Sequence, residues 1–178
     1  DFVVKGGNAV AGVSRINQEN SIPTVKDIEK TVLKALNLLP KDSATAGSIG
    51  KKAPGGSSGD IDLLVDSEKI IKNNKLKSAD DLFPLVLKVA KKFSGSVKDL
   101  RGAGIITLAY PITNADGKQP NEKVQLDLMI TDNLSLLRDF TMWTPSFEES
   151  KWKGLYRSEL LMAIARAMNF KTIETAFN

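Results

Sequence analysis

One strand, Asp60-Ile61-Asp62-Leu63-Leu64-Val65, constrains this chain more than any other segment. Its apolar residues are typical of a buried strand, and a Gly/Ser/Lys-rich loop, residues 47–59, precedes it. Side chains two positions apart in a strand share a face, so Asp60 and Asp62 point the same way while their apolar neighbours point into the core. Such a pair repels itself unless a proton or a cation neutralises it, and a divalent ion is the simpler answer.

A third carboxylate lies on a later strand. Residues 105–112 and 123–130 are strand candidates, and the turn-rich link 114–117 between them predicts a hairpin. Alternation along the second strand places Asp127 and Gln125 on one face and the leucines on the other. If this strand lies beside the first, three carboxylates converge, which is a ligand set for two Mg²⁺ ions.

The rest of the chain predicts helices around these strands. Thr24 with Asp27 resembles a capping box, and apolar residues at helical spacing continue to a break near Pro40. Residues 81–93 have a second apolar stripe. Further predicted elements are a short strand at 43–46 and a closing helix at 156–168, whereas 134–145 carries no clear pattern.

This order of elements predicts an α+β fold with a mixed or antiparallel sheet covered by helices. Three regions are expected: an irregular N-terminal arm (1–23), a main domain (24–133) and a C-terminal helical segment (134–178).

Two absences narrow the chemistry, because the chain has neither cysteine nor histidine. Zinc fingers, thiol chemistry and histidine-assisted nucleophiles are therefore excluded, and oxygen ligands alone suit Mg²⁺ or Mn²⁺. A net charge of +4 favours a polyanionic partner only weakly. The chain has no signal-peptide pattern and no apolar run of membrane-spanning length, so we expect a cytoplasmic protein without membrane contact.

The loop before the first strand has the features of a phosphate site. Small residues offer backbone N–H groups at Gly47, Ser48, Ser58 and Gly59, and a basic pair, Lys51-Lys52, adds positive charge. The loop does not follow the P-loop pattern. A Gly-rich loop and an Asp-x-Asp strand are each common on protein surfaces, and their adjacency is the specific signal.

Together these motifs resemble the nucleotidyltransferase superfamily of DNA polymerase β, and within it the family X DNA polymerases. The resemblance covers about residues 24–130 and rests on four motifs in order: Gly47-Ser48, Lys51-Lys52, the run from Ser57 to Val65, and Val124-Gln125-Leu126-Asp127-Leu128. It implies the palm fold of these enzymes. It also implies that the substrate is an NTP or dNTP and that two Mg²⁺ or Mn²⁺ ions are the cofactors.

The resemblance assigns roles to single residues. It implies that Asp60 and Asp62 hold both metals, and that Asp127 holds the metal that lowers the pKa of the acceptor hydroxyl. Ser48, Ser58 and Gly59 would contact the β- and γ-phosphates, as would Gly47 beside them. Either Lys51 or Lys52 would stand in the place of a phosphate-binding arginine.

The chain also departs from this family. Gln125 replaces a basic residue two positions before the third aspartate, and the loop between Ser48 and Asp60 is about two residues longer than in the polymerases. Tyr156-Arg157-Ser158 matches the sugar-selecting motif poorly, and only 51 residues follow Asp127.

The expected activity is polymerase-like or terminal-transferase-like: transfer of a nucleoside monophosphate to a hydroxyl, with release of pyrophosphate. A nucleic-acid 3′-OH is the favoured acceptor, so DNA or RNA is the expected partner. Two alternatives stay open at this point, namely modification of a small molecule or protein, and an inactive nucleotide-binding interaction module.

Overall fold

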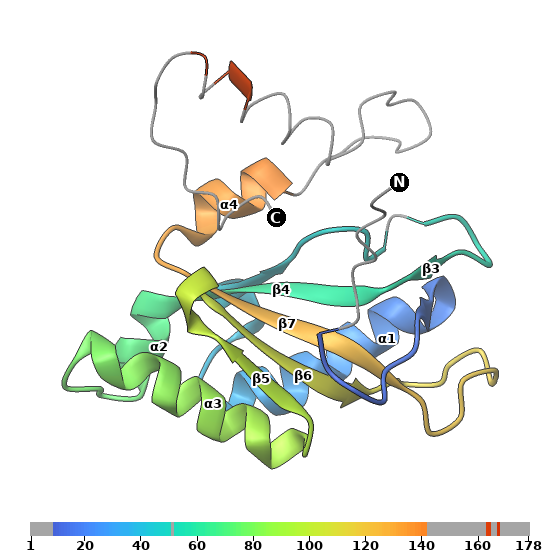
Figure 1. Cartoon of the computed structure of the whole chain (residues 1–178), viewed down its shortest axis with the longest axis horizontal. Helices are drawn as coiled ribbons and strands as arrows, with labels where there is room; N and C mark the ends of the chain where they lie inside the picture. The colour runs from blue at the N-terminus through green and yellow to red at the C-terminus, as the bar shows by residue number, and fades with distance from the viewer. Residues whose placement is uncertain (1–8, 51, 142–162, 165–166, 168–178) are drawn as a thin grey trace.

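A computed structural model describes residues 9–50, 52–141, 163–164 and 167 (Figure 1). Its main sheet has five strands in the order β2-β4-β7-β6-β5, and a second sheet pairs β1 with β3. The strands are β1 (Ile16–Asn17), β2 (Ser43–Thr45), β3 (Ser57–Ser58), β4 (Asp60–Asp66), β5 (Val97–Leu100), β6 (Ile105–Pro111) and β7 (Lys123–Thr131). The α-helices are α1 (Gln18–Ile28), α2 (Ser67–Asn73), α3 (Leu82–Phe93) and α4 (Leu134–Thr141).

The main sheet is mixed, which confirms the predicted α+β class. Its central strands β4 and β7 run parallel, whereas β2 pairs antiparallel with β4 and β6 pairs antiparallel with β7. The predicted hairpin is therefore correct, and β4 begins at Asp60 as expected. Parallel pairing of β4 with β7 sets the two carboxylate-bearing strands side by side.

The two faces of this sheet have different roles. Ile61, Leu63, Leu126 and Leu128 are almost fully buried, and they share one core with apolar residues of α1 and α3. The opposite face carries the aspartates of β4 and β7, and α4 packs on β4 and β2 on that side (Figure 1). Strand alternation thus separates the core from a polar face, as the sequence predicted.

The first helix begins at Gln18, six residues before the predicted start at Thr24. Thr24 lies inside the helix, where its hydroxyl donates to the Asn20 carbonyl at 2.7 Å and accepts from the backbone of Thr113 at 3.0 Å. The helix then continues as a π-helical turn, Glu29–Leu33. Polar residues around Asn20 looked irregular in sequence because their hydrogen-bond partners are distant along the chain.

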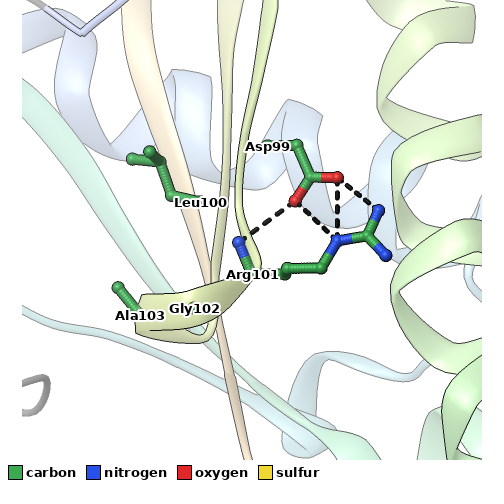
Figure 2. Close-up of a pocket in the computed structure, with 5 residues that line it drawn as sticks. All are labelled: Asp99, Leu100, Arg101, Gly102 and Ala103. Carbon is green, nitrogen blue, oxygen red and sulfur yellow. Dashed lines mark hydrogen bonds and ion pairs between the residues drawn. The ribbon is translucent and has the colours of Figure 1, made fainter.

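Two short elements, α2 and β5, were not predicted from the sequence. Asp66 caps α2 by accepting the Lys69 N–H at 3.0 Å. Strand β5 forms an edge of the sheet and carries exposed Lys98 and Asp99. Figure 2 shows its end, where the Arg101 guanidinium donates to Asp99 and Leu100 points to the other side of the strand.

The chain then turns into β6 through a 3-10 turn, Arg101–Ala103, and a left-handed Gly104 at φ 75°.

The C-terminal part is described only in places. Helix α4 occupies part of the segment 134–145, for which the sequence showed no clear pattern. The predicted helix 156–168 and the motif Tyr156-Arg157-Ser158 lie outside the described residues, apart from 163, 164 and 167. Within the described part of the chain, no helix has the length and apolar character needed to cross a membrane.

Candidate metal centre

Three carboxylates, Asp60, Asp62 and Asp127, gather on the polar face of the sheet. Asp62 and Asp127 are direct partners in the parallel β4–β7 pairing, and Asp60 lies two residues earlier on the same face. One oxygen from each residue lies within 4.8 Å of the others. This carboxylate cluster is a group that could hold a metal ion, and it joins the three residues predicted as ligands.

Burial raises the pKa of every carboxyl in the cluster, and repulsion between carboxylates adds to the shift at Asp60 and Asp62. Burial first, and then the charges of Asp60 and Asp127, raise the pKa of Asp62 to about 7. Burial and the Asp127 charge also raise the pKa of Asp60, against the opposing charge of Arg15. The nearby protein therefore supplies less positive charge than the cluster needs.

The pKa of Asp127 is raised mainly by burial as well, and the polar side chains of Thr107 and Gln125 oppose the shift. Thr107 faces Asp127 across the β6–β7 pairing. Its hydroxyl is close enough to lower the pKa of Asp127, yet the buried oxygen makes no hydrogen bond of good geometry within the described residues. A buried polar atom beside the cluster is thus left for a further partner.

Gly47 lies directly against the cluster. Its φ is +64°, and a Cβ atom at this position would lie 2.3 Å from the Asp62 Oδ2 atom. The neighbouring Ala46 N–H donates to the Asp62 carbonyl at 2.9 Å, which extends the β2–β4 pairing into the loop. A side chain here would force the Asp62 carboxylate to turn away, and the positive φ strains any residue other than glycine.

Two of the predicted phosphate residues contact each other. The hydroxyls of Ser48 and Ser58 are 2.8 Å apart, and Ser58 is only 1% exposed. Gly59 lies between β3 and β4, directly before Asp60. The loop after Gly47 and the start of β4 are therefore joined beside the carboxylates through two hydroxyl groups.

The structure does not show which of the two predicted lysines, Lys51 or Lys52, would contact a phosphate. Lys51 lies outside the described residues. Lys52 is exposed, and its backbone N–H donates to Gln18 Oε1 at 3.3 Å. The assignment of a phosphate-binding lysine stays a prediction.

Arg15 is a cation that the sequence analysis missed. Its guanidinium donates to the Ser57 hydroxyl at 3.0 Å and to the Ser57 carbonyl at 2.8 Å, and its charge lowers the pKa of Asp60. Arg15 reaches this position because β1 pairs with β3, joining Ile16 to Ser58. In the sequence it stands in a polar stretch without periodicity, so its charge was the only available signal.

A hollow of about 610 Å³ lies where β4 and β7 end, and none of the three aspartates lines it. Leu64 and Met129, which line it, are the next residues on that face after Asp62 and Asp127. Leu136 and Leu137 of α4 form another part of its wall. Its volume falls within the range of small-molecule sites in proteins.

No model of a known protein family matches this chain, and no curated protein sequence matches it.

Proposed function

We propose that this protein is a metal-dependent nucleotidyltransferase of the polymerase β type, which transfers a nucleoside monophosphate from an NTP or dNTP to a hydroxyl. The observation that carries the proposal is the carboxylate cluster, with its oxygens within 4.8 Å of one another, set beside Gly47 and the Ser48–Ser58 hydroxyl pair. The motif order that resembles these enzymes and the five-stranded mixed sheet support it.

The residues of the cluster fit Mg²⁺ or Mn²⁺. All three ligands are carboxylates, which hard divalent cations prefer. Burial raises all three pKa values and repulsion adds to the shift at Asp60 and Asp62, so a cation would relieve the cost of ionising them; the buried Thr107 hydroxyl makes no hydrogen bond of good geometry within the described residues. Two bound ions would stabilise the attacking and leaving oxygens and lower the pKa of the acceptor hydroxyl.

The chain's own residues divide the remaining work. Asp60 and Asp62 would hold both ions, and Asp127 would hold the ion on the acceptor side. The hydroxyls of Ser48 and Ser58, the Gly59 backbone and the Arg15 guanidinium would contact the β- and γ-phosphates. Such positioning and charge neutralisation are the main contributions of a protein to phosphoryl transfer.

The reaction balances without an oxidant or a further co-reactant. The acceptor oxygen forms a bond to the α-phosphorus and loses its proton. The bond between the α-phosphorus and the bridging oxygen to the β-phosphate breaks, and pyrophosphate leaves with the bonding electrons.

Charge distribution favours a nucleic acid as a partner. The segment 66–101 contains nine lysines and arginines and five aspartates and glutamates, so it carries a net charge of +4, equal to that of the whole chain. All nine basic residues are exposed, and they belong to α2, α3, β5 and the adjoining turns. Exposed cations of this kind attract phosphate backbones.

The decisive experiment measures transfer from labelled NTPs and dNTPs to DNA and RNA primers with Mg²⁺ or Mn²⁺. We expect Asp60→Asn and Asp62→Asn each to lower the rate by at least about 100-fold, because each removes a ligand from both ions. Asp132→Asn is the matched control, since Asp132 is exposed and lies just past the end of β7. Metal-dependent transfer that survives both ligand substitutions would overturn the proposal.

A further inference from the structure

The N-terminal segment, residues 9–14, crosses the polar face of the sheet. The Ser14 N–H donates to the Lys123 carbonyl of β7 at 2.7 Å, and the Ala11 carbonyl accepts from the Ser96 hydroxyl at 3.3 Å. Figure 1 shows this segment in dark blue, lying over β7 before it enters α1. The segment therefore packs on the strand that supplies the third carboxylate.

Gln125 connects the N-terminal segment to the carboxylate cluster. Its Oε1 atom accepts the Ala9 N–H at 2.7 Å, and its Nε2 atom donates to both oxygens of Asp127, at 3.0 and 3.2 Å. The side chain is only 4% exposed, and it faces Asp60 across the β4–β7 pairing. A continuous path of hydrogen bonds thus runs from the Ala9 backbone to the Asp127 carboxylate.

The orientation of the Gln125 amide follows from its partners. The Ala9 N–H can only donate, and the ionised Asp127 carboxylate can only accept. Turning the amide over would set Nε2 against an N–H and Oε1 against two carboxylate oxygens, so both contacts would become repulsive. The Ala9 backbone therefore fixes which end of the amide faces Asp127.

We infer that Gln125 is a positioning residue that holds Asp127 in the orientation in which it binds the cation, and that the Ala9 N–H holds Gln125. This inference rests on the proposed function. A neutral amide suits the role, because it restrains the carboxylate through two hydrogen bonds without cancelling the charge that the cation requires. Groups that orient metal ligands in this way contribute strongly to metal affinity.

The test measures Mn²⁺ affinity of the intact chain by electron paramagnetic resonance, without nucleotide or acceptor. Gln125→Met keeps the length of the side chain but removes both the donor and the acceptor. We expect it to weaken Mn²⁺ binding by about 10- to 100-fold. Ala9→Pro removes the N–H, besides fixing φ at this position, and leaves the Gln125 side chain in place, so it should weaken binding less; Ala9→Gly retains the N–H and should bind like the wild type.

A matched control separates positioning from general loss of stability. Asn74 ends α2, and its amide donates to the carbonyls of Leu36 and Ile70 at 2.8 and 2.9 Å. Asn74→Leu should lower the unfolding temperature and leave Mn²⁺ affinity unchanged. Unfolding temperatures of all variants are measured on the same samples.

The outcomes distinguish this inference from the proposed function. If wild-type protein shows no Mn²⁺ binding that Asp62→Asn abolishes, the proposed function fails. If the wild type binds Mn²⁺ and Asp62→Asn abolishes that binding, the positioning role is tested by the other variants. It is overturned when Gln125→Met binds Mn²⁺ within about two-fold of wild type, or when Asn74→Leu weakens binding as much as Gln125→Met does. Loss with Gln125→Met, partial loss with Ala9→Pro and none with Asn74→Leu support it.

Discussion

Replacing Asp62 by asparagine should stabilise the metal-free protein at alkaline pH. The folded state raises the pKa of Asp62 from its ordinary value of 3.8 to about 7. A group with a raised pKa contributes stability that is present below pH 4 and is lost as the pH rises through 7. Asparagine has nearly the same shape as aspartate and carries no charge, so the variant avoids this loss.

The size of the effect follows from the two pKa values. Each pH unit between them costs about 1.4 kcal/mol, so ionising Asp62 destabilises the folded protein by about 4 kcal/mol at pH 8. For a chain of this length the corresponding change in unfolding temperature is on the order of 10 °C. Removing the Asp62 charge also relieves repulsion of Asp60, whose pKa is raised by burial and by Asp127.

The assay is guanidinium unfolding of wild type and Asp62→Asn with a chelator, between pH 4 and pH 8. The variant should gain stability over wild type as the pH rises, and Mg²⁺ should then stabilise the wild type more than the variant. Asp132→Asn, which changes an exposed carboxylate, should follow the wild-type curve. Parallel curves for wild type and Asp62→Asn across this range would refute the argument that the cluster is under electrostatic strain.

Three further predictions test the surroundings of the cluster. Gly47→Ala should lower the free energy of unfolding by more than about 3 kcal/mol and abolish Mn²⁺ binding, because its Cβ would lie 2.3 Å from the Asp62 Oδ2 atom. Gly12→Ala is the control: its φ is +75° and the space around it is open, so it should lower the free energy of unfolding by only about 1–2 kcal/mol. Equal unfolding curves for the two variants would contradict this. Arg15→Gln should weaken binding of a nonhydrolysable triphosphate about ten-fold by calorimetry, whereas Arg101→Gln, paired with Asp99, should not. Asn20→Leu should lower the free energy of unfolding by about 2 kcal/mol, since the buried Gln119 and the half-buried Asp116 each lose a donor; a change below about 0.5 kcal/mol would contradict this.

The carboxylate cluster could be predicted because strand alternation is a local property. Asp60 and Asp62 share a face in any strand, and Asp127 follows the same period. Their convergence needed one further condition, adjacency of β4 and β7, which the structure shows. The hairpin of β6 and β7 was also predictable, because its turn residues stand between two regular strands.

The missed features depend on contacts between distant parts of the chain. The start of α1 reads as irregular because Asn17 and Asn20 satisfy their amides with Asp116, about a hundred residues away. Arg15 reaches the site only through the pairing of β1 with β3. Neither Asp116 as the partner of these asparagines nor β3 as the partner of β1 can be identified from spacing in a single sequence. The residues just before Pro23 also lack apolar residues at helical spacing.

Parallel pairing of β4 with β7 also has a consequence for the folding of the chain. Asp62 and Asp127 are direct partners, yet they lie 65 positions apart in the sequence, and the stretch between them contains α2, α3, β5 and β6. Closing so long a loop loses much chain entropy before any contact compensates for it, and such non-local pairing slows folding. Asp60 and Asp62 lie on one strand and share a face as soon as that strand is extended. The full set of three ligands exists only once β4 has paired with β7. Divalent cation binding should therefore report on a late step of folding, and it should slow unfolding more than it accelerates refolding.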